Sequence, residues 1–194
     1  MADMTLANTE LGLDRRSDRF DPLTIAMHWT TLLLLVAMFA TAWSLKAATN
    51  GAAADGLLLA HRSTGALLWL LVLARLVWKA SFGRAAALPP TVGRLQHAVA
   101  RANELGLYLL LVLQPVTGLG QSLFRGKSFV LLGVSLPVIV ARNRALTTAF
   151  HHIHAVGAWI LLGLIALHAS AALFHHFVLR DGVLRAMLPR RQRP

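Results

Sequence analysis

Four histidines lie within long apolar stretches of the chain: His28, His61, His154 and His168. Ionisable side chains at membrane depth are energetically costly and usually have a function. The neutral imidazole ring is a common ligand of iron and other metals. His154 and His168 are 14 residues apart, which on an α-helix places them on one face and roughly 21 Å apart along its axis. That separation is too large for a single metal ion, so the pattern predicts two separate centres.

The four histidines fall at two depths when the apolar stretches are taken as antiparallel helices. His61 then pairs with His154 near one membrane surface, and His28 pairs with His168 nearer the other. One imidazole on each side of a flat ring is the axial ligand set of b-type haem, and a chain without cysteine has no thioether attachment. We therefore predict two haem b groups with these histidines as iron ligands. The alternative is that each histidine hydrogen-bonds to a neighbouring helix, which does not explain the matched depths.

Three further basic residues lie on the side of the His28–His168 pair, Arg75 at its depth and His175 and His176 nearer the membrane surface. Arg75 follows His61 by 14 residues and so shares its face, which predicts a contact with a haem propionate. The alternative is that Arg75 reaches the membrane surface beside Lys79. His175 and His176 are candidates for contact with a quinone or a propionate, or else for helix packing.

The composition indicates that membrane-spanning helices position these residues. The 194-residue chain is 56% hydrophobic and only 14% charged, with a mean hydropathy of +0.59, which argues against a soluble enzyme, a disordered tail or a coiled coil. We predict an all-α fold, a transmembrane four-helix bundle, with four spans of about 20 residues or more. The spans are expected at 22–45, 57–80, 103–124 and 151–179. They form one membrane domain over 22–180, flanked by an N-terminal tail at 1–21 and a basic tail at 181–194.

The distribution of Lys and Arg predicts the orientation. The net charge is +11, and thirteen of the 19 basic residues fall on the side that holds both termini. The positive-inside rule therefore places both termini in the cytoplasm and the loop 125–150 outside. Its apolar segment 128–140 is short and contains Pro137, so we interpret it as an interfacial piece and not a fifth span. Because the basic residues lie between apolar runs, nucleic-acid binding is disfavoured.

Several motifs together resemble the bacterial cytochrome b561 family. They are R-F-D-P-L-T-I-A-M-H-W at 19–29, H-R-S-T-G at 61–65, Q-P-V-T-G at 114–118, H-A-V-G at 154–157 and L-H-A-S-A-A-L-F-H-H-F at 167–177. The resemblance extends over about residues 19–191. It implies a four-helix protein of the bacterial inner membrane with two b haems, held by His28, His61, His154 and His168. Some members resemble a superoxide oxidase that passes electrons from periplasmic superoxide to ubiquinone.

The outer loop suggests which electron donor is used. It carries four basic residues, Arg125, Lys127, Arg142 and Arg144. A positive field at this face would attract a small anion such as superoxide, although the same residues would also bind lipid headgroups. We therefore expect a membrane oxidoreductase of the superoxide:ubiquinone type.

Three other functions fit parts of the same sequence. The first is a haem subunit that docks a partner dehydrogenase or hydrogenase, because related cytochromes serve as such subunits. The second is a non-haem metal enzyme built on the histidine clusters His151–His152–His154 and His175–His176, and the third is a channel with proton-relay histidines.

Overall fold

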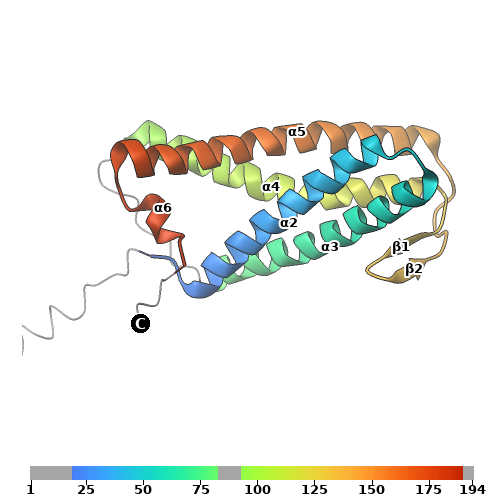
Figure 1. The fold of residues 1–194 in the computed structure, drawn as a ribbon, viewed down its shortest axis with the longest axis horizontal. Helices are drawn as coiled ribbons and strands as arrows, with labels where there is room; N and C mark the ends of the chain where they lie inside the picture. The colour runs from blue at the N-terminus through green and yellow to red at the C-terminus, as the bar shows by residue number, and fades with distance from the viewer. Residues whose placement is uncertain (1–18, 83–92, 190–194) are drawn as a thin grey trace, which may run out of the picture.

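Four long helices form the body of the protein, as the computed structural model shows for residues 19–82 and 93–189 (Figure 1). They are α2 (Pro22–Ala47), α3 (Gly51–Ser81), α4 (Arg94–Phe124) and α5 (Arg144–Phe174). All four are long and apolar enough to cross a membrane. The predicted all-α four-helix bundle is therefore confirmed. The tail predictions for residues 1–18 and 190–194 lie outside the described residues.

Side-chain caps define where the helices begin. Asp21 accepts a hydrogen bond from the Thr24 amide at 2.9 Å, with Pro22 in the first turn of α2. Asn50 and Asn143 cap α3 and α5 in the same way. Three of the helices have 31 residues, about 46 Å, whereas the hydrocarbon core is about 30 Å thick. These three helices begin six to nine residues before the expected spans, and α5 ends at Phe174, from where η1 continues to Leu179.

The helices pack as two antiparallel pairs, α2 with α3 and α4 with α5, joined by contacts between α3 and α4. At one end of the bundle, called here the hairpin end, lies a two-stranded sheet of β1 (Phe129–Leu131) and β2 (Val134–Leu136). The other end, the terminal end, holds the beginning and the end of the described chain (Figure 1).

The segment expected to be an interfacial piece is thus an antiparallel hairpin. Its two-residue turn, Leu132–Gly133, has positive φ at both positions, 52° and 80°, which is the type I′ geometry that suits strand twist. The Leu132 amide donates to Ser63 Oγ at 3.1 Å, which fastens the hairpin tip to α3. Phe129 is the buried side chain of the hairpin.

The hydrophobic core lies midway along the bundle. It consists of one cluster with members from all four helices: Leu35, Leu68, Val72, Leu111 and Leu161. Leu68 follows His61 by seven residues, and Leu161 follows His154 by seven and precedes His168 by seven. An aliphatic layer therefore separates the two histidine levels and excludes water between them.

The chain after α5 turns back onto the bundle at the terminal end. A π-helical turn, η1 (His175–Leu179), leads through Arg180 at a φ of 53° into the short helix α6 (Val183–Ala186). Trp29 Nε1 donates to the Met187 carbonyl at 2.8 Å, which ties this segment to α2. Residues 181–189, expected as the start of a basic tail, are therefore packed on the helices.

Candidate functional site

Two pairs of imidazole rings face each other across the bundle. At the hairpin end, the ring centroids of His61 on α3 and His154 on α5 are 6.3 Å apart. At the terminal end, those of His28 on α2 and His168 on α5 are 6.1 Å apart. The pairs are those expected from depth. That these rings bind iron remains a prediction.

The spacing within each pair fits a bis-imidazole iron site. A metal–imidazole bond is about 2.0–2.1 Å long and the nitrogen lies about 1.1 Å from the ring centre, so two imidazoles that held one metal ion between them would have centroids up to about 6.3 Å apart. The observed separations of 6.3 and 6.1 Å agree with this value. The four histidines therefore fit two haem groups, one at each level.

Hydrogen bonds at the hairpin end leave the outer ring nitrogens available for iron. The Gln114 carbonyl lies 3.0 Å from His154 Nδ1, and because a carbonyl only accepts, Nδ1 carries the proton. Thr41 Oγ1 lies 3.0 Å from His61 Nδ1, and its own proton is directed to the carbonyls of Ala37 and Met38. It therefore accepts from His61. In both rings Nε2 is then the free ligand atom, as in other histidine–metal sites.

Glycine on α4 makes room for the His154 ring. A Cβ added to Gly118 would lie 3.2 Å from His154 Cε1, closer than ordinary van der Waals contact. On the same helix, Thr117 Oγ1 lies 3.0 Å from His154 Nδ1. The Q-P-V-T-G motif thus supports His154. In the sequence, Gly118 is recognisable as a small residue within the third span, whereas the rest of the motif is indicated only by the family resemblance.

At the terminal end, Arg75 lies beside the histidine pair. Its Nη2 is 3.4 Å from His28 Nδ1, and its guanidinium carbon is 5.6 Å from the centroid of the Tyr108 ring. A guanidinium only donates, so this contact needs an unprotonated Nδ1, whereas a neutral ring that binds iron through Nε2 keeps its proton on Nδ1. Haem binding would therefore release Arg75 toward another acceptor. Lys79, in contrast, is exposed and forms an ion pair with Glu104.

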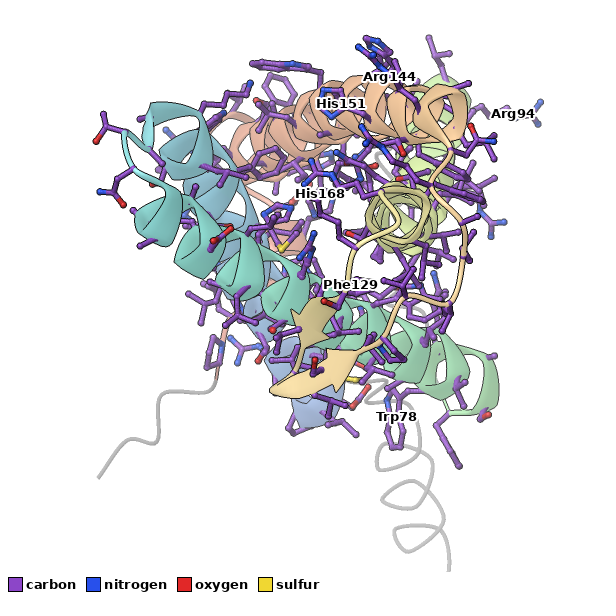
Figure 2. The ribbon with its side chains drawn as sticks, turned by 90° about the vertical axis from the view of Figure 1, so that its right-hand side faces the viewer. Trp78, Arg94, Phe129, Arg144, His151 and His168 are labelled. Carbon is purple, nitrogen blue, oxygen red and sulfur yellow. The ribbon has the colours of Figure 1, made fainter. Side chains whose placement is uncertain are left out.

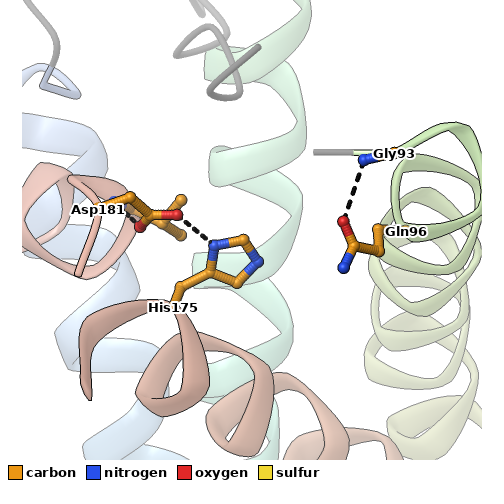
Figure 3. A network of polar contacts seen from close by, with 5 residues as sticks. Gly93, Gln96, His175 and Asp181 are labelled. Atoms are coloured by element: carbon orange, nitrogen blue, oxygen red, sulfur yellow. Dashed lines mark hydrogen bonds and ion pairs between the residues drawn. The ribbon is translucent and has the colours of Figure 1, made fainter. Parts of the chain in front are cut away.

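The two histidines at the end of α5 have different surroundings. His175 Nδ1 donates to Asp181 Oδ2 at 2.5 Å (Figure 3). Burial raises the pKa of Asp181, but the hydrogen bonds from His175 and the Val183 amide outweigh it and lower the pKa below the usual 3.8. His176 Nδ1 is buried and has no hydrogen-bond partner among the described residues.

The exposed histidines at the hairpin end do not form a metal centre with other residues. His151 lies against Gln121, and its ring centroid is 5.7 Å from that of His152. Within residues 19–82 and 93–189, no three His, Cys, Asp or Glu side chains converge to hold a metal ion. The described geometry therefore gives no support to a non-haem histidine cluster.

The four basic residues of the outer loop line one pocket. Arg125, Lys127, Arg142 and Arg144 surround a volume of about 360 Å³ together with Thr147, and no acidic side chain lines it. Gly126 allows the two segments that carry these cations, 125–127 and 142–144, to approach each other closely. It has a φ of 63°, and a Cβ there would lie 2.8 Å from Arg142 Cα. Figure 2 views the protein from this end, with Arg144 and Phe129 labelled. This grouping is called the basic pocket below.

A helical membrane bundle with paired imidazoles at two depths has the architecture of a membrane cytochrome of the b type. A family model described as prokaryotic cytochrome b561 matches residues 19–190, and the chain belongs to this family. It is thus a multi-pass protein of the bacterial inner membrane with a role in electron transfer, and its family binds haem b.

Three relatives are similar over nearly their full length. Cytochrome b561 homolog 1 of Escherichia coli (strain K12) is 32% identical over 177 residues, 90% of this chain and 99% of the relative. A protein of Yersinia pestis named probable superoxide oxidase CybB is 27% identical, covering 90% of this chain and 98% of its own. Cytochrome b561 homolog 2 of Escherichia coli is 28% identical, with coverage of 88% and 92%.

Proposed function

We propose that this protein binds two haem b groups, one between His61 and His154 and one between His28 and His168, and carries electrons from superoxide to ubiquinone. The facing ring pairs support the two sites. When bound, haem supplies the one-electron redox chemistry. In the overall reaction, two superoxide anions each lose one electron and become dioxygen. One ubiquinone takes up both electrons and two protons and becomes ubiquinol.

The basic pocket is the observation that favours superoxide as the donor. Four cations with no lining acid create a positive field where α4 and α5 meet the outer loop. Such a field raises the association rate of a small anion by about 10- to 1,000-fold at low salt. The relative named probable superoxide oxidase supports the same donor. In this proposal the hairpin end faces outward and both termini face the cytoplasm, in accordance with the positive-inside rule.

The terminal end is the proposed site of quinone reduction. Arg75 would bind a haem propionate there once its contact with His28 is released. His176 has a buried, unpartnered nitrogen, and His175 is oriented by Asp181, so both are available to hold or move a proton near a quinone. The aliphatic layer around Val72, which is only 1% exposed, keeps water out between the two levels.

Stopped-flow reduction of the purified, haem-loaded protein by superoxide tests this proposal. We expect the rate to fall steeply with ionic strength, and to fall severalfold at low salt in Lys127→Gln and Arg142→Gln. Lys46→Gln is the matched control, because it removes an exposed cation that does not line the pocket. A rate that is insensitive to salt and to both pocket substitutions would contradict superoxide steering and favour the partner-docking haem subunit. Reoxidation by added ubiquinone tests the acceptor.

A further inference from the structure

Arg62 is a cation next to a predicted iron ligand, and the functions described above do not use it. It follows His61 on α3 and lines a separate cavity of about 190 Å³ between α3, α4 and the hairpin. Arg125 and Lys127 also line this cavity, and Asp55 is the single carboxylate on its wall. The cavity therefore carries more positive than negative charge.

Two contacts hold the Arg62 side chain in one position. Its Nε donates to Ser122 Oγ at 3.1 Å, and its guanidinium carbon lies 5.0 Å from the centroid of the Phe129 ring. Ser122 is 7% exposed and uses its own proton on the Gly118 carbonyl at 3.1 Å, so its lone pair faces Arg62. The guanidinium is thus oriented by a buried hydroxyl and an aromatic ring.

The Arg62 guanidinium forms no ion pair within 4 Å among the described residues, and Asp55, on the same cavity wall, attracts it only from a longer distance. Neither of the two ion pairs given for residues 19–82 and 93–189 includes Arg62. A partly buried guanidinium is stabilised by an oxyanion, and its planar fork matches a carboxylate. The cavity has three cations, Arg62, Arg125 and Lys127, and one carboxylate, Asp55, so it has the donors and the charge to bind a further carboxylate.

The location of Arg62 indicates where that carboxylate comes from. Ser122 and Gly118 are one turn apart on α4, and Gly118 lies against the His154 ring. Arg62 is thus next to His61 in the chain, and its partner Ser122 is hydrogen-bonded to the turn of α4 that packs against the His154 ring. The terminal end has a matching arrangement, in which Arg75 lies against the Tyr108 ring beside His28.

We propose that Arg62 binds a propionate carboxylate of the haem held by His61 and His154, and that the hairpin holds Arg62 in place through Phe129. This inference rests on the proposed function, because it requires haem at that site. It also gives the hairpin a role: the Leu132–Ser63 hydrogen bond fastens it to α3 next to Arg62.

Redox titration of the full-length haem protein tests this assignment. Loss of the Arg62 charge favours the oxidised iron, so we expect Arg62→Gln to lower the midpoint potential of the His61–His154 haem. The expected change is at least tenfold in the reduction equilibrium, which is about 59 mV for one electron. Phe129→Leu should lower the potential in the same direction but by less. Lys46→Gln, which removes an exposed cation at the same end, should leave it unchanged.

Two further measurements make the outcome specific. Arg62→Lys keeps the charge and should shift the potential less than Arg62→Gln, whereas equal shifts would contradict a charge interaction. A wild-type potential that changes with chloride or phosphate at constant ionic strength would show that Arg62 binds a free anion instead of a propionate.

Haem content distinguishes this inference from the proposed function. Wild-type protein that holds no haem at the His61–His154 pair would contradict the proposed function itself. Fully loaded Arg62→Gln protein with the same potential as Lys46→Gln would overturn only the role of Arg62.

Discussion

At the residue scale, the positions of protons make these histidines suitable as ligands. His154 donates its Nδ1 proton to a backbone carbonyl and His61 donates to a threonine that has no spare proton. Each ring is thereby held in the tautomer that presents Nε2 to a metal, and such outer partners typically change metal affinity by about 10- to 100-fold. The terminal-end pair differs, because His28 Nδ1 faces the Arg75 guanidinium, which is a hydrogen-bond donor, and not an acceptor.

The ring pairing predicts which haem each histidine variant loses. His61→Ala and His154→Ala should each remove the same haem, and His28→Ala and His168→Ala should each remove the other, since each pair faces one space. A pyridine haemochrome assay should give two haems per chain in wild-type protein and one in each variant. One haem in the wild type, or four different patterns of loss, would refute the pairing.

Arg75 and Lys79 should differ in their effect on the terminal-end haem. Arg75 lies 3.4 Å from His28, whereas Lys79 is exposed and pairs with Glu104. Arg75→Leu should therefore lower that haem's midpoint potential by about 60 mV or more, a tenfold change in the equilibrium, and leave the other haem unchanged. Lys79→Leu is the control. If a redox titration gave small and equal shifts of the midpoint potential in the Arg75→Leu and Lys79→Leu variants, Arg75 would be an ordinary surface cation.

At the scale of helices and strands, close packing of α4 against α5 determines where the His154 ring lies. Three α4 glycines have side chains of α5 within 3.2 Å of where their Cβ would be: Gly106 against Leu164, Gly118 against His154 and Gly120 against Phe150. Small residues commonly allow such approach between membrane helices. The ligand ring is therefore positioned by the interface between two helices and not by α5 alone.

A larger residue at Gly118 should displace a ligand without unfolding the bundle. Gly118→Val places atoms where His154 Cε1 lies, so we expect loss of the hairpin-end haem and a destabilisation of about 1–3 kcal/mol. Gly163→Val is the matched control, because a Cβ at Gly163 meets nothing within 4 Å. Haem content and thermal unfolding measure both effects. Equal haem content in the two variants would contradict this view of the interface.

The segment after α5 should detach from the bundle in acid. The pKa of Asp181 in the folded protein lies below its ordinary value of 3.8, so the Asp181 carboxylate contributes stability above that value. The contribution is lost as the pH falls through the lowered pKa. Proteolysis after Arg185 should therefore increase below about pH 4 in wild-type protein. Asp181→Asn should be cleaved faster already at neutral pH and show little further change in acid.

In the whole molecule, the two ends of the bundle differ. One end carries the cationic side chains of the outer loop and the β1–β2 hairpin, and the other holds the first and last described residues. The basic pocket and the Arg62 cavity share Arg125 and Lys127, so the outer loop concentrates positive charge beside the His61–His154 level. The aliphatic layer then separates this level from the His28–His168 level. In the proposed orientation, superoxide gives up its electron on one side of the membrane and quinone is reduced on the other.

The absence of cysteine from the sequence makes this orientation directly testable. Ser135→Cys lies on the exposed part of the hairpin and Ser81→Cys lies exposed at the terminal end of α3. A membrane-impermeant thiol reagent should label Ser135→Cys in intact spheroplasts, and Ser81→Cys only after permeabilisation. The reverse pattern would place the hairpin in the cytoplasm and remove the argument for periplasmic superoxide.

Some features of the fold left no signal that could be recognised in the sequence. The sequence of 129–136 indicates only an interfacial segment, because its turn is Leu-Gly and not the Asn-Gly or Asp-Gly that signals a type I′ turn. The segment around α6 has the sequence of a tail, because four helical residues show no periodicity. The partners Thr41, Ser122 and Phe129 have no recognisable pattern in the sequence, since they are isolated hydroxyl and aromatic side chains.

The amino-acid sequence is sufficient to predict the four helices, the membrane class, the family and the two depths of the histidines. It could do so because hydropathy marks each span, and because a helix rises a constant 1.5 Å per residue, so that residue number measures depth. The packing of the helices shows which rings face each other at 6.3 and 6.1 Å, and which nitrogen of His61 and His154 is hydrogen-bonded. It also placed Arg62 between Ser122 and Phe129 and brought the basic residues around one pocket. These contacts join segments that are far apart in the chain. Their geometry depends on how the helices are rotated, on the close approach at glycines and on the backbone turn at Gly126.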